Sequence, residues 1–437
     1  MTSGCPFATF QQSEPHPDPY AVYEKLRAEY GPLIPIELEP GVNAWIVTDY
    51  QTLVAWSRDT SNFSYDPRNW KDFREGRVAP DFSLLQMMAP RPNALYVDGV
   101  EHQRYRRALS DSLGAVRETY LSEITERYAG GLIDRFCEQG TVDLVDQYAR
   151  LLPILVLNEL FGFDEDQGLR FAGAMRKVVV GVDAERANAE AERALSEVVA
   201  AKHANPGEDL TSRLIGHRSA LTDEEVIQQM RLMMAWGVET VLALTCASVR
   251  AALTGSALSP GRAPSRTALA ELVDRVLWES PPITNFPAVY PRVDIPVGGG
   301  RVIDAGTPIL LGLAAANHFY RLENAERLEE APNRAHLAWG AGPHRCPARD
   351  EATVITIVAL RTLFERLPDL GLAVPPQELR WYVTNLASVF VDLPVRFTPT
   401  SRRSPEETKA PLPSEGGRPS SVLSSLSDFL VRLLRGS

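Results

Sequence analysis

The chain has 437 residues, of which 44% are hydrophobic, and this is enough to fill a large core. Its 56 acidic residues outnumber its 45 basic ones and give a net charge of −11, which argues against a nucleic-acid-binding protein. The four cysteines are widely spaced and form no Cys-x-x-Cys pair, so neither a disulfide framework nor a structural zinc site is expected. The N-terminus carries no secretory signal and no apolar run is long enough for a transmembrane segment, so we expect a cytoplasmic protein.

Hydrophobic periodicity predicts a mainly α-helical protein with smaller β-sheets, an α+β fold. A short amphipathic helix is expected at 18–29, followed by two strands within 33–49. Apolar residues then recur at helical spacing from 98 to about 255, and this predicts helices at 118–137, 142–161, 164–180, 184–202 and 223–254. The later elements predicted are a helix at 266–279, strands within 285–312, a helix at 347–367 and strands within 381–397.

The composition changes sharply after Phe397. Residues 398–420 are rich in Pro, Ser and charge, which predicts a disordered linker. Leucines then recur on one face of 421–434, which predicts an amphipathic helix in the tail 421–437. We expect this helix to bind a partner protein or a membrane surface, or else to fold back on its own domain. That domain would comprise residues 1–397.

The segment 336–364 is the most informative part of the sequence. A glycine-rich loop there leads into Cys346, just ahead of a predicted helix. Loop glycines let the backbone approach a flat ligand, and the N-terminus of a helix stabilises a thiolate. Taken alone, Cys346 could be a nucleophile, a metal ligand or a buried structural cysteine.

The residues before Cys346 form the longer pattern Trp339-Gly340-x-Gly342-x-His344-x-Cys346. This pattern resembles the haem-thiolate signature of the cytochromes P450. The resemblance implies the P450 fold, a triangular helical domain whose long central helix lies over a haem b (iron protoporphyrin IX) cofactor. It also implies that Cys346 is the metal ligand, that His344 binds a haem propionate and that Trp339 packs beside the sulfur.

A second segment matches the family well before the cysteine. His102 and Arg106 lie four residues apart on one face of a predicted helix, so both side chains can reach one anionic group. In a helix of unknown role this pair would more simply belong to a solvated face. The resemblance implies instead that His102 and Arg106 hold a haem propionate.

The helix predicted at 223–254 is apolar around most of its middle, which is typical of a buried helix at the centre of a large domain. Its segment 235–240, Ala-Trp-Gly-Val-Glu-Thr, resembles the oxygen-activation motif of the family. The resemblance implies that Gly237 thins the helix over the haem, that Thr240 hydrogen-bonds the reacting oxygen and that Glu239 relays protons. The alternative for Thr240 is a hydrogen bond to its own helix. Trp236 is bulkier than the corresponding residue of the family and is expected to narrow the pocket.

The sequence departs from the family pattern in three places. The Glu-x-x-Arg pair of the family falls on Asp274 and Leu277, so its arginine is missing, and Trp278 is a candidate to offset that loss. The propionate-binding arginine of the next strand falls on Val289, although Arg292 is near. Immediately after the cysteine, a proline lacks the N–H that could bond to the sulfur. A missing Glu-x-x-Arg beside a retained cysteine loop resembles an actinobacterial, conservon-associated subset of the family.

The resemblance implies a monooxygenase that inserts one atom of O2 into a small organic substrate, with electrons from a ferredoxin and a ferredoxin reductase. Apolar residues within 81–96 are expected to line its pocket: Leu84, Leu85, Met87 and Met88. A basic patch for an acidic ferredoxin is expected from Arg104, Arg107, Arg345 and Arg349. The departures and Trp236 leave a second hypothesis, a haem-binding regulatory or interaction protein with little oxygenase activity. A cysteine enzyme without haem is disfavoured because no His/Asn partner pattern accompanies Cys346.

Overall fold

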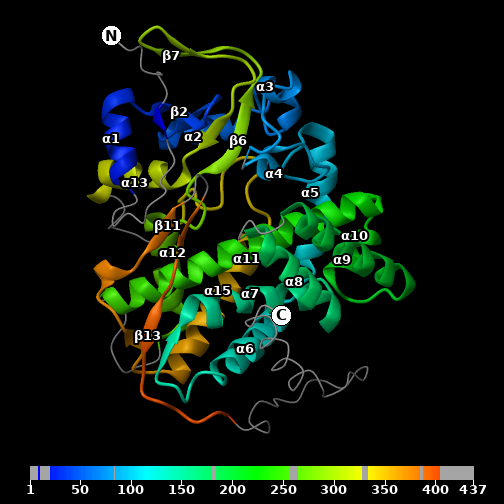
Figure 1. Ribbon diagram of the computed structural model, residues 1–437, viewed down its shortest axis with the longest axis vertical. Coiled ribbons are helices and arrows are strands. Elements are labelled where there is room, and N and C mark those ends of the chain that lie inside the picture. Colours follow the sequence, from blue (N-terminus) through cyan, green and yellow to red (C-terminus); the bar gives the residue numbers. More distant parts are fainter. Residues whose placement is uncertain are drawn as a thin grey trace.

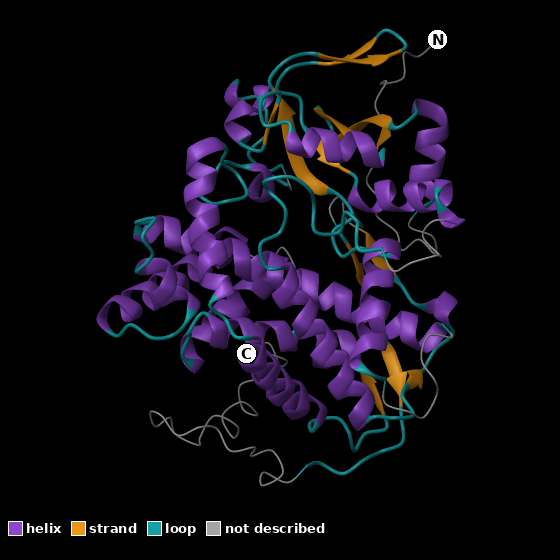
Figure 2. Cartoon of the chain, turned by 180° about the vertical axis from the view of Figure 1, so that it is seen from behind, coloured by secondary structure: helices purple, strands orange, loops and turns teal. Residues whose placement is uncertain are grey.

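The computed structural model describes residues 8–9, 20–82, 84–179, 184–255, 264–326, 333–383 and 387–403. Helices form one part of the molecule, and the largest sheet, with a few short helices, forms the other (Figures 1 and 2). Helix α11 (Asp223–Thr254) crosses the molecule between the two parts, as Figure 1 shows. This arrangement confirms the expected mainly α-helical fold with smaller sheets.

The predicted long helices are present with small shifts at their ends. Helix α11 begins with a capping box, in which the Thr222 hydroxyl accepts from the Glu225 amide and the Glu225 carboxylate accepts from the Thr222 amide. The other helices of this part are α5 (Gly99–Gly114), α6 (Glu118–Ile133), α7 (Leu151–Leu160), α8 (Glu165–Val179), α9 (Ala184–Ala204), α10 (Leu210–Ile215), α12 (Arg266–Glu279) and α15 (Arg349–Arg366).

One predicted helix, 142–161, is wrong in its first half. Residues Thr141–Asp143 form strand β5, and Val145–Ala149 form a π-helical turn before α7 starts. Val142 pairs with Val395 on strand β13 (Pro394–Arg396), so a partner 250 residues away overrides the helical spacing. The third strand of this small sheet is β10 (Gly371–Leu372).

The largest sheet has six strands in the order β1-β2-β3-β9-β6-β4. These are β1 (Ala8–Thr9), β2 (Leu33–Glu39), β3 (Val42–Val47), β9 (Ile309–Leu311), β6 (Phe286–Pro291) and β4 (Phe63–Ser64). Two hairpins stand apart from it, β7 (Ile295–Gly298) with β8 (Arg301–Ile303), and β11 (Trp381–Val383) with β12 (Ser388–Phe390). The short helices of this part are α1 (Ala21–Tyr30), α2 (Tyr50–Arg58), α3 (Lys71–Arg74), α4 (Leu85–Met88) and α13 (Leu313–Glu323), with single 3-10 turns at Pro67–Asn69 and Pro376–Glu378.

The buried apolar side chains gather in separate clusters, and the Cys346 loop lies where two of them meet. The helical cluster contains Trp339 and is contacted by Cys346. A cluster under the largest sheet, built around Trp45, Tyr65 and Ile283, is contacted by Ala341 of the same loop. We call this second group the sheet cluster. The loop therefore joins the two parts of the fold.

The remaining cysteines and the segment after Phe397 differ in where they lie in the structure. Cys137 and Cys246 are free and buried; Cys246 lies in α11, whereas Cys137 lies in a turn after α6 and outside the helix predicted to reach residue 137. Residues 398–403 still bond to the domain, for example through the Thr400 amide and the Cys137 carbonyl at 2.8 Å, so contacts with the domain continue beyond Phe397. Cys5 and the predicted tail helix at 421–434 lie outside the described residues.

Within the described residues, α11 is the one helix whose length and apolar character would suit a membrane span. More than half of its most apolar stretch is buried inside the protein. Its contacts with α7, α9, α12 and α15 give it the central position in the helical part that the sequence predicted.

Candidate functional site

The loop before α15 is held in shape by backbone hydrogen bonds. The Gly340 amide donates to the Leu337 carbonyl at 2.8 Å, and the Cys346 amide donates to the Trp339 carbonyl at 2.9 Å. These bonds fold the chain back on itself and present Cys346 three residues ahead of α15. The expected position of the cysteine, just before a helix, is confirmed.

The two loop glycines are required by geometry. Gly340 and Gly342 have φ angles of 71° and 68°, in the left-handed region that favours glycine. A Cβ atom on Gly342 would lie 2.1 Å from the Ser57 carbonyl oxygen at the end of α2. Gly342 therefore lets the loop pack directly on the backbone of α2, and no larger residue fits there without a shift.

The surroundings of the Cys346 thiol act on its pKa in opposite directions. Burial raises the pKa, while a hydrogen bond from the Ala348 amide and the positive charges of Arg106 and Arg345 lower it. The Ala348 amide thus supplies a donor to the sulfur where Pro347 cannot. A bound metal ion would stabilise the thiolate further, as expected for a coordinating sulfur.

Helix α5 brings His102 and Arg106 to the same place. His102 is 5% exposed, its ring lies 4.0 Å from the His344 ring between centroids, and its Nε2 atom has no hydrogen-bond partner in the described part of the chain. Burial, with the neighbouring His344 and Arg106, lowers the pKa of His102 to about 3, so the ring is neutral. Arg106 is half-buried and forms no ion pair with a described residue, although Cys346 and Arg345 lie close enough to shift its pKa. Both residues therefore lie beside the cysteine loop, as expected from their spacing.

His344 is held from its other side by an unforeseen partner, Asp98. The Asp98 carboxylate lies 3.6 Å from the His344 Nε2 atom and accepts hydrogen bonds from the Ser64 hydroxyl, the Tyr65 amide at 3.1 Å and the Arg292 guanidinium at 3.0 Å. Burial alone would raise the pKa of Asp98, but the His344, Ser64 and Tyr65 contacts lower it to about 2. Arg292 is therefore paired with a carboxylate. Asp98 lies four residues before His102, at the N-cap of α5, and that spacing was the one sequence signal that could have revealed it.

The ring of His344 lies between two aromatic neighbours. Tyr65 stacks on it with centroids 3.8 Å apart, and the ring of His102 lies on it at 4.0 Å. The His344 side chain is 2% exposed. Burial lowers the pKa of His344, against the opposing effects of Asp98 and of a hydrogen bond to the Ala94 backbone.

The α11 segment 235–240 is half-buried, whereas the next two turns, 241–249, are fully buried. Thr240 makes no hydrogen bond within the described residues. In α15, by contrast, Thr353, Thr356 and Thr362 each donate to the carbonyl four residues earlier, at 2.7–2.9 Å. The alternative that Thr240 bonds to its own helix is therefore not supported.

Glu239 and Gly237 face other parts of the structure. Burial raises the pKa of Glu239, and the positive charge of Arg150 opposes this rise. A Cβ atom on Gly237 would lie 3.0 Å from the Leu157 side chain of α7. Gly237 therefore allows α11 to pack closely on α7. That it also thins the helix over a haem remains a prediction.

Trp236, one turn before Thr240, packs against the sheet cluster. The same cluster is contacted by Ala341 of the cysteine loop and by Ala387 of the β11–β12 hairpin. The indole therefore lies on the side of α11 that faces the sheet part, and that it narrows the pocket remains a prediction.

The absent Glu-x-x-Arg pair has identifiable replacements. Asp274 bonds to Arg334 at 2.8 Å, and Leu277 is 1% exposed in the helical cluster. Trp278 donates from Nε1 to the Asn333 carbonyl at 2.5 Å. Both contacts join α12 to the segment that leads into the cysteine loop, so the structure supports Trp278 as part of the brace.

Two further expectations are corrected. Met88 is 1% exposed in a second cluster under the sheet, so it fills the core and does not line an open pocket. Leu84, Leu85 and Met87 are half-buried, and for them a pocket-lining role remains a prediction. Arg104 forms two hydrogen bonds to Glu225 and is not free to join a basic patch. The other expected patch residues differ, because Arg349 lies 3.2 Å from Asp350, while Arg107 and Arg345 are exposed.

The groups around Cys346 fit a haem. The His102 Nε2 atom is buried without a hydrogen-bond partner among the described residues, and the Arg106 guanidinium forms no ion pair there. Buried polar groups of this kind call for partners, and the propionates of a haem are suitable ones. Cys346 is itself only partly covered by the described residues, as suits a sulfur that binds a metal.

Comparisons with known proteins agree with this assignment. No family model matches the chain. It is 30% identical to the cytochrome P450 monooxygenase PikC of Streptomyces venezuelae, over 87% of this chain and 91% of the relative. It is 28% identical to the 2-hydroxy-5-methyl-1-naphthoate 7-hydroxylase of Streptomyces carzinostaticus, over 84% of this chain and 93% of the relative. The solved structure of CYP154A1 from Streptomyces coelicolor A3(2) is similar with a TM-score of 0.74 and 30% identity, over 88% of this chain and 98% of the other. The chain therefore belongs to the bacterial cytochrome P450 monooxygenases, whose cofactor is haem b.

Proposed function

We propose that this monooxygenase inserts one oxygen atom of O2 into a C–H bond of a small organic substrate, with electrons from a ferredoxin-type partner. The substrate, O2, two electrons and two protons then give the hydroxylated product and one water. The observation that carries the proposal is the convergence of Cys346, Arg106, His102 and His344 from two distant segments. When bound, the haem supplies the redox chemistry that activates dioxygen.

Cys346 is the proposed metal ligand. Its thiolate is favoured by the Ala348 amide and by Arg106 and Arg345, against the effect of burial. His102, Arg106 and His344 are the proposed propionate ligands, since the three side chains gather beside the cysteine loop and Arg106 forms no ion pair with a described residue. Trp339, 8% exposed in the helical cluster, is the proposed aromatic neighbour of the sulfur.

Thr240 and Glu239 are the proposed proton-delivering residues. The Thr240 hydroxyl is not bonded to its own helix, so it is free to hydrogen-bond the reacting oxygen. The raised pKa of Glu239 favours the neutral acid, which can give up a proton. Arg150, near Glu239, pairs at 3.4 Å with Asp146, whose side chain is 60% exposed, and this pair marks where protons can enter from solvent.

Two features bear on the substrate and the partner. Trp236 lies one turn from Thr240 and packs against the sheet cluster, and its bulk there favours small or flat substrates over bulky ones. Arg107 and Arg345 are exposed near the cysteine loop, and an acidic ferredoxin suits such a surface. The proposed setting is the cytoplasm, where soluble ferredoxins are reduced.

The carbon monoxide spectrum of the reduced protein tests the thiolate. The haem-loaded wild type should show the red-shifted Soret band of thiolate ligation, and Cys346→Ser should lose it. Cys137→Ala is the matched control, because it removes a buried cysteine in a turn after α6 and should keep the band. A wild-type protein that binds haem without this band would overturn the proposal.

Thr240→Ala tests the proton delivery. The variant should consume O2 and reduced ferredoxin while forming about tenfold less product per O2. Thr245→Ala, on the buried continuation of the same helix, is the control and should leave this ratio unchanged. An unaltered ratio in Thr240→Ala would remove the residue from the mechanism.

A further inference from the structure

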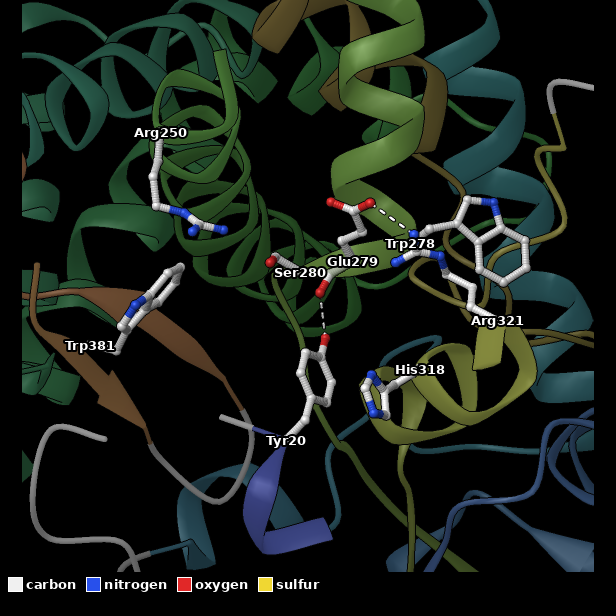
Figure 3. A pocket seen from close by; sticks show the side chains of 8 residues that line it. All are labelled: Tyr20, Arg250, Trp278, Glu279, Ser280, His318, Arg321 and Trp381. Atoms are coloured by element: carbon white, nitrogen blue, oxygen red, sulfur yellow. Dashed lines mark hydrogen bonds and ion pairs between the residues drawn. The ribbon is translucent and has the colours of Figure 1, made fainter. Parts of the chain in front are cut away.

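A cavity of about 260 Å³ lies at the far end of α11, where α12, α13 and strand β11 approach each other (Figure 3). Arg250, which lines it, is ten residues beyond Thr240 on α11, or roughly 15 Å along the helix axis at 1.5 Å per residue. The cavity is therefore distinct from the site around Cys346.

Two hydrogen-bond donors in this cavity lack partners. The Arg250 guanidinium lies over the Trp381 ring, 5.3 Å from its centroid, and its Nε atom is buried without a hydrogen-bond partner among the described residues. The Ser280 hydroxyl, at the C-cap of α12, also makes no hydrogen bond within the described part of the chain. Figure 3 shows both groups facing the same space.

The acceptors around the cavity take part in hydrogen bonds. The Glu279 carbonyl accepts from the Tyr20 hydroxyl at 2.5 Å, and one oxygen of the Glu279 carboxylate accepts from Arg321 at 2.9 Å. His318 bonds to Glu24 at 3.0 Å. Figure 3 draws the Tyr20 and Arg321 contacts as dashed lines between the residues concerned. The carboxylate of Glu279 is therefore held by Arg321, whereas the donors of Arg250 and Ser280 have no such partner among the described residues.

The net charge of the residues that line the cavity also favours an anionic ligand. Arg250 and Arg321 contribute two positive charges and Glu279 one negative charge, so these groups give the lining a net positive charge of one. Burial lowers the pKa of Arg250, and the negative charge of Glu279 opposes this effect. Arg250 forms no ion pair with a described residue, and a planar carboxylate is a good complement because two N–H groups of the guanidinium match two oxygens.

We propose that this cavity is a binding site for a small monocarboxylate with a flat apolar body. The carboxylate bonds to the guanidinium of Arg250 and the hydroxyl of Ser280, and the body lies against the rings of Trp381 and Tyr20. A volume of about 260 Å³ lies just below the usual range for ligand pockets, so the ligand is a compact acid and not a macrocycle or a long fatty acid. The site is separate from the monooxygenase chemistry and does not depend on it.

Benzoate is a suitable probe for the full-length, haem-loaded protein. Calorimetric titration should show saturable binding with one benzoate per chain and no change in the Soret spectrum, because the cavity is remote from Cys346. Arg250→Gln should weaken binding about tenfold to a hundredfold, the range for loss of a charge-assisted hydrogen bond. Ser280→Ala should weaken it by a smaller factor. Benzamide, a neutral molecule of the same shape, should bind at least about tenfold more weakly than benzoate.

Two controls keep the proposal open to refutation. Arg218→Gln removes an arginine that is 75% exposed elsewhere on the surface and should not alter benzoate affinity. Arg250→Lys keeps the charge but loses the two parallel N–H donors, so its benzoate affinity should lie between those of wild type and Arg250→Gln. It also supplies the comparison if Arg250→Gln does not fold. Equal benzoate affinities in wild type, Arg250→Gln and Arg250→Lys would overturn the proposal. A Soret shift with the same midpoint as the heat signal would also overturn it, since benzoate would then lie beside the haem.

Discussion

Replacing Trp278 by phenylalanine tests how the protein braces the segment before Cys346 without the arginine of the Glu-x-x-Arg pair. Trp278 is 6% exposed, donates from Nε1 to the Asn333 carbonyl at 2.5 Å and stacks on Tyr320 and Tyr50 with centroids 6.0 Å and 6.4 Å away. Phenylalanine keeps most of the stacking area and removes the donor. Asn333 lies six residues before Trp339, so the lost bond should loosen the approach to the cysteine loop.

The size of the effect follows from the surroundings of that bond. The contact is only partly buried, so water can replace the lost donor to some extent, and the hydrogen bond should contribute about 1 kcal/mol. The smaller ring adds about 1 kcal/mol through lost packing. Trp278→Phe should therefore lower the free energy of unfolding by about 2 kcal/mol, and Trp278→Ala by about 3–5 kcal/mol because the whole ring is removed.

Trp70→Phe is the matched control. Trp70 is fully buried, stacks on Tyr290 and has an Nε1 atom without a hydrogen-bond partner among the described residues, so this variant loses packing but no bond. Urea unfolding of the haem-loaded proteins and transfer of haem to apomyoglobin measure the two effects. Haem transfer should accelerate in Trp278→Phe and not in Trp70→Phe. If both variants lose haem at the same rate, the proposed brace is wrong.

Three further predictions concern the loop, its charged support and the pocket. Gly342→Ala should sharply reduce haem incorporation, because its Cβ atom would lie 2.1 Å from the Ser57 carbonyl oxygen. Gly299→Ala, at φ 60° with no atom within 4 Å, should keep the haem and lower the free energy of unfolding, measured in urea, by about 1 kcal/mol. Asp98 has a pKa of about 2, below its ordinary value, so its contribution of about 2 kcal/mol is present above about pH 4 and is lost as the pH falls towards 2. The stability gap between wild type and Asp98→Asn, measured by denaturant unfolding, should accordingly narrow over that range, and a gap independent of pH would contradict the assignment. Trp236→Ala should increase the affinity for 4-phenylimidazole by about tenfold or more and leave the affinity for imidazole unchanged. The Soret shift measures both affinities, and an equal change for the two ligands would show that the indole does not limit the pocket.

The sequence by itself determined the elements that depend on local pattern. Helical spacing located α11 and α12, because the pattern of apolar residues acts within a few residues. The cysteine loop was equally clear, since its glycines are required by positive φ angles within the loop itself. That His102 and Arg106 lie on one face of α5 followed from their four-residue spacing alone.

The tertiary structure decided which distant groups meet. Strand β5 replaced a predicted helical turn because Val142 pairs with Val395. Met88 is buried in the second cluster under the sheet, whose members come from separate elements and could not be seen together in the sequence. Asp98 faces His344, Trp278 reaches Asn333, and Arg104 is taken by Glu225, in each case through contacts between separate elements. The position of the Arg250 guanidinium over Trp381, without an ion pair among the described residues, emerged in the same way, since it depends on every element that packs around it. Such contacts arise from the packing of whole elements, and no local periodicity encodes them.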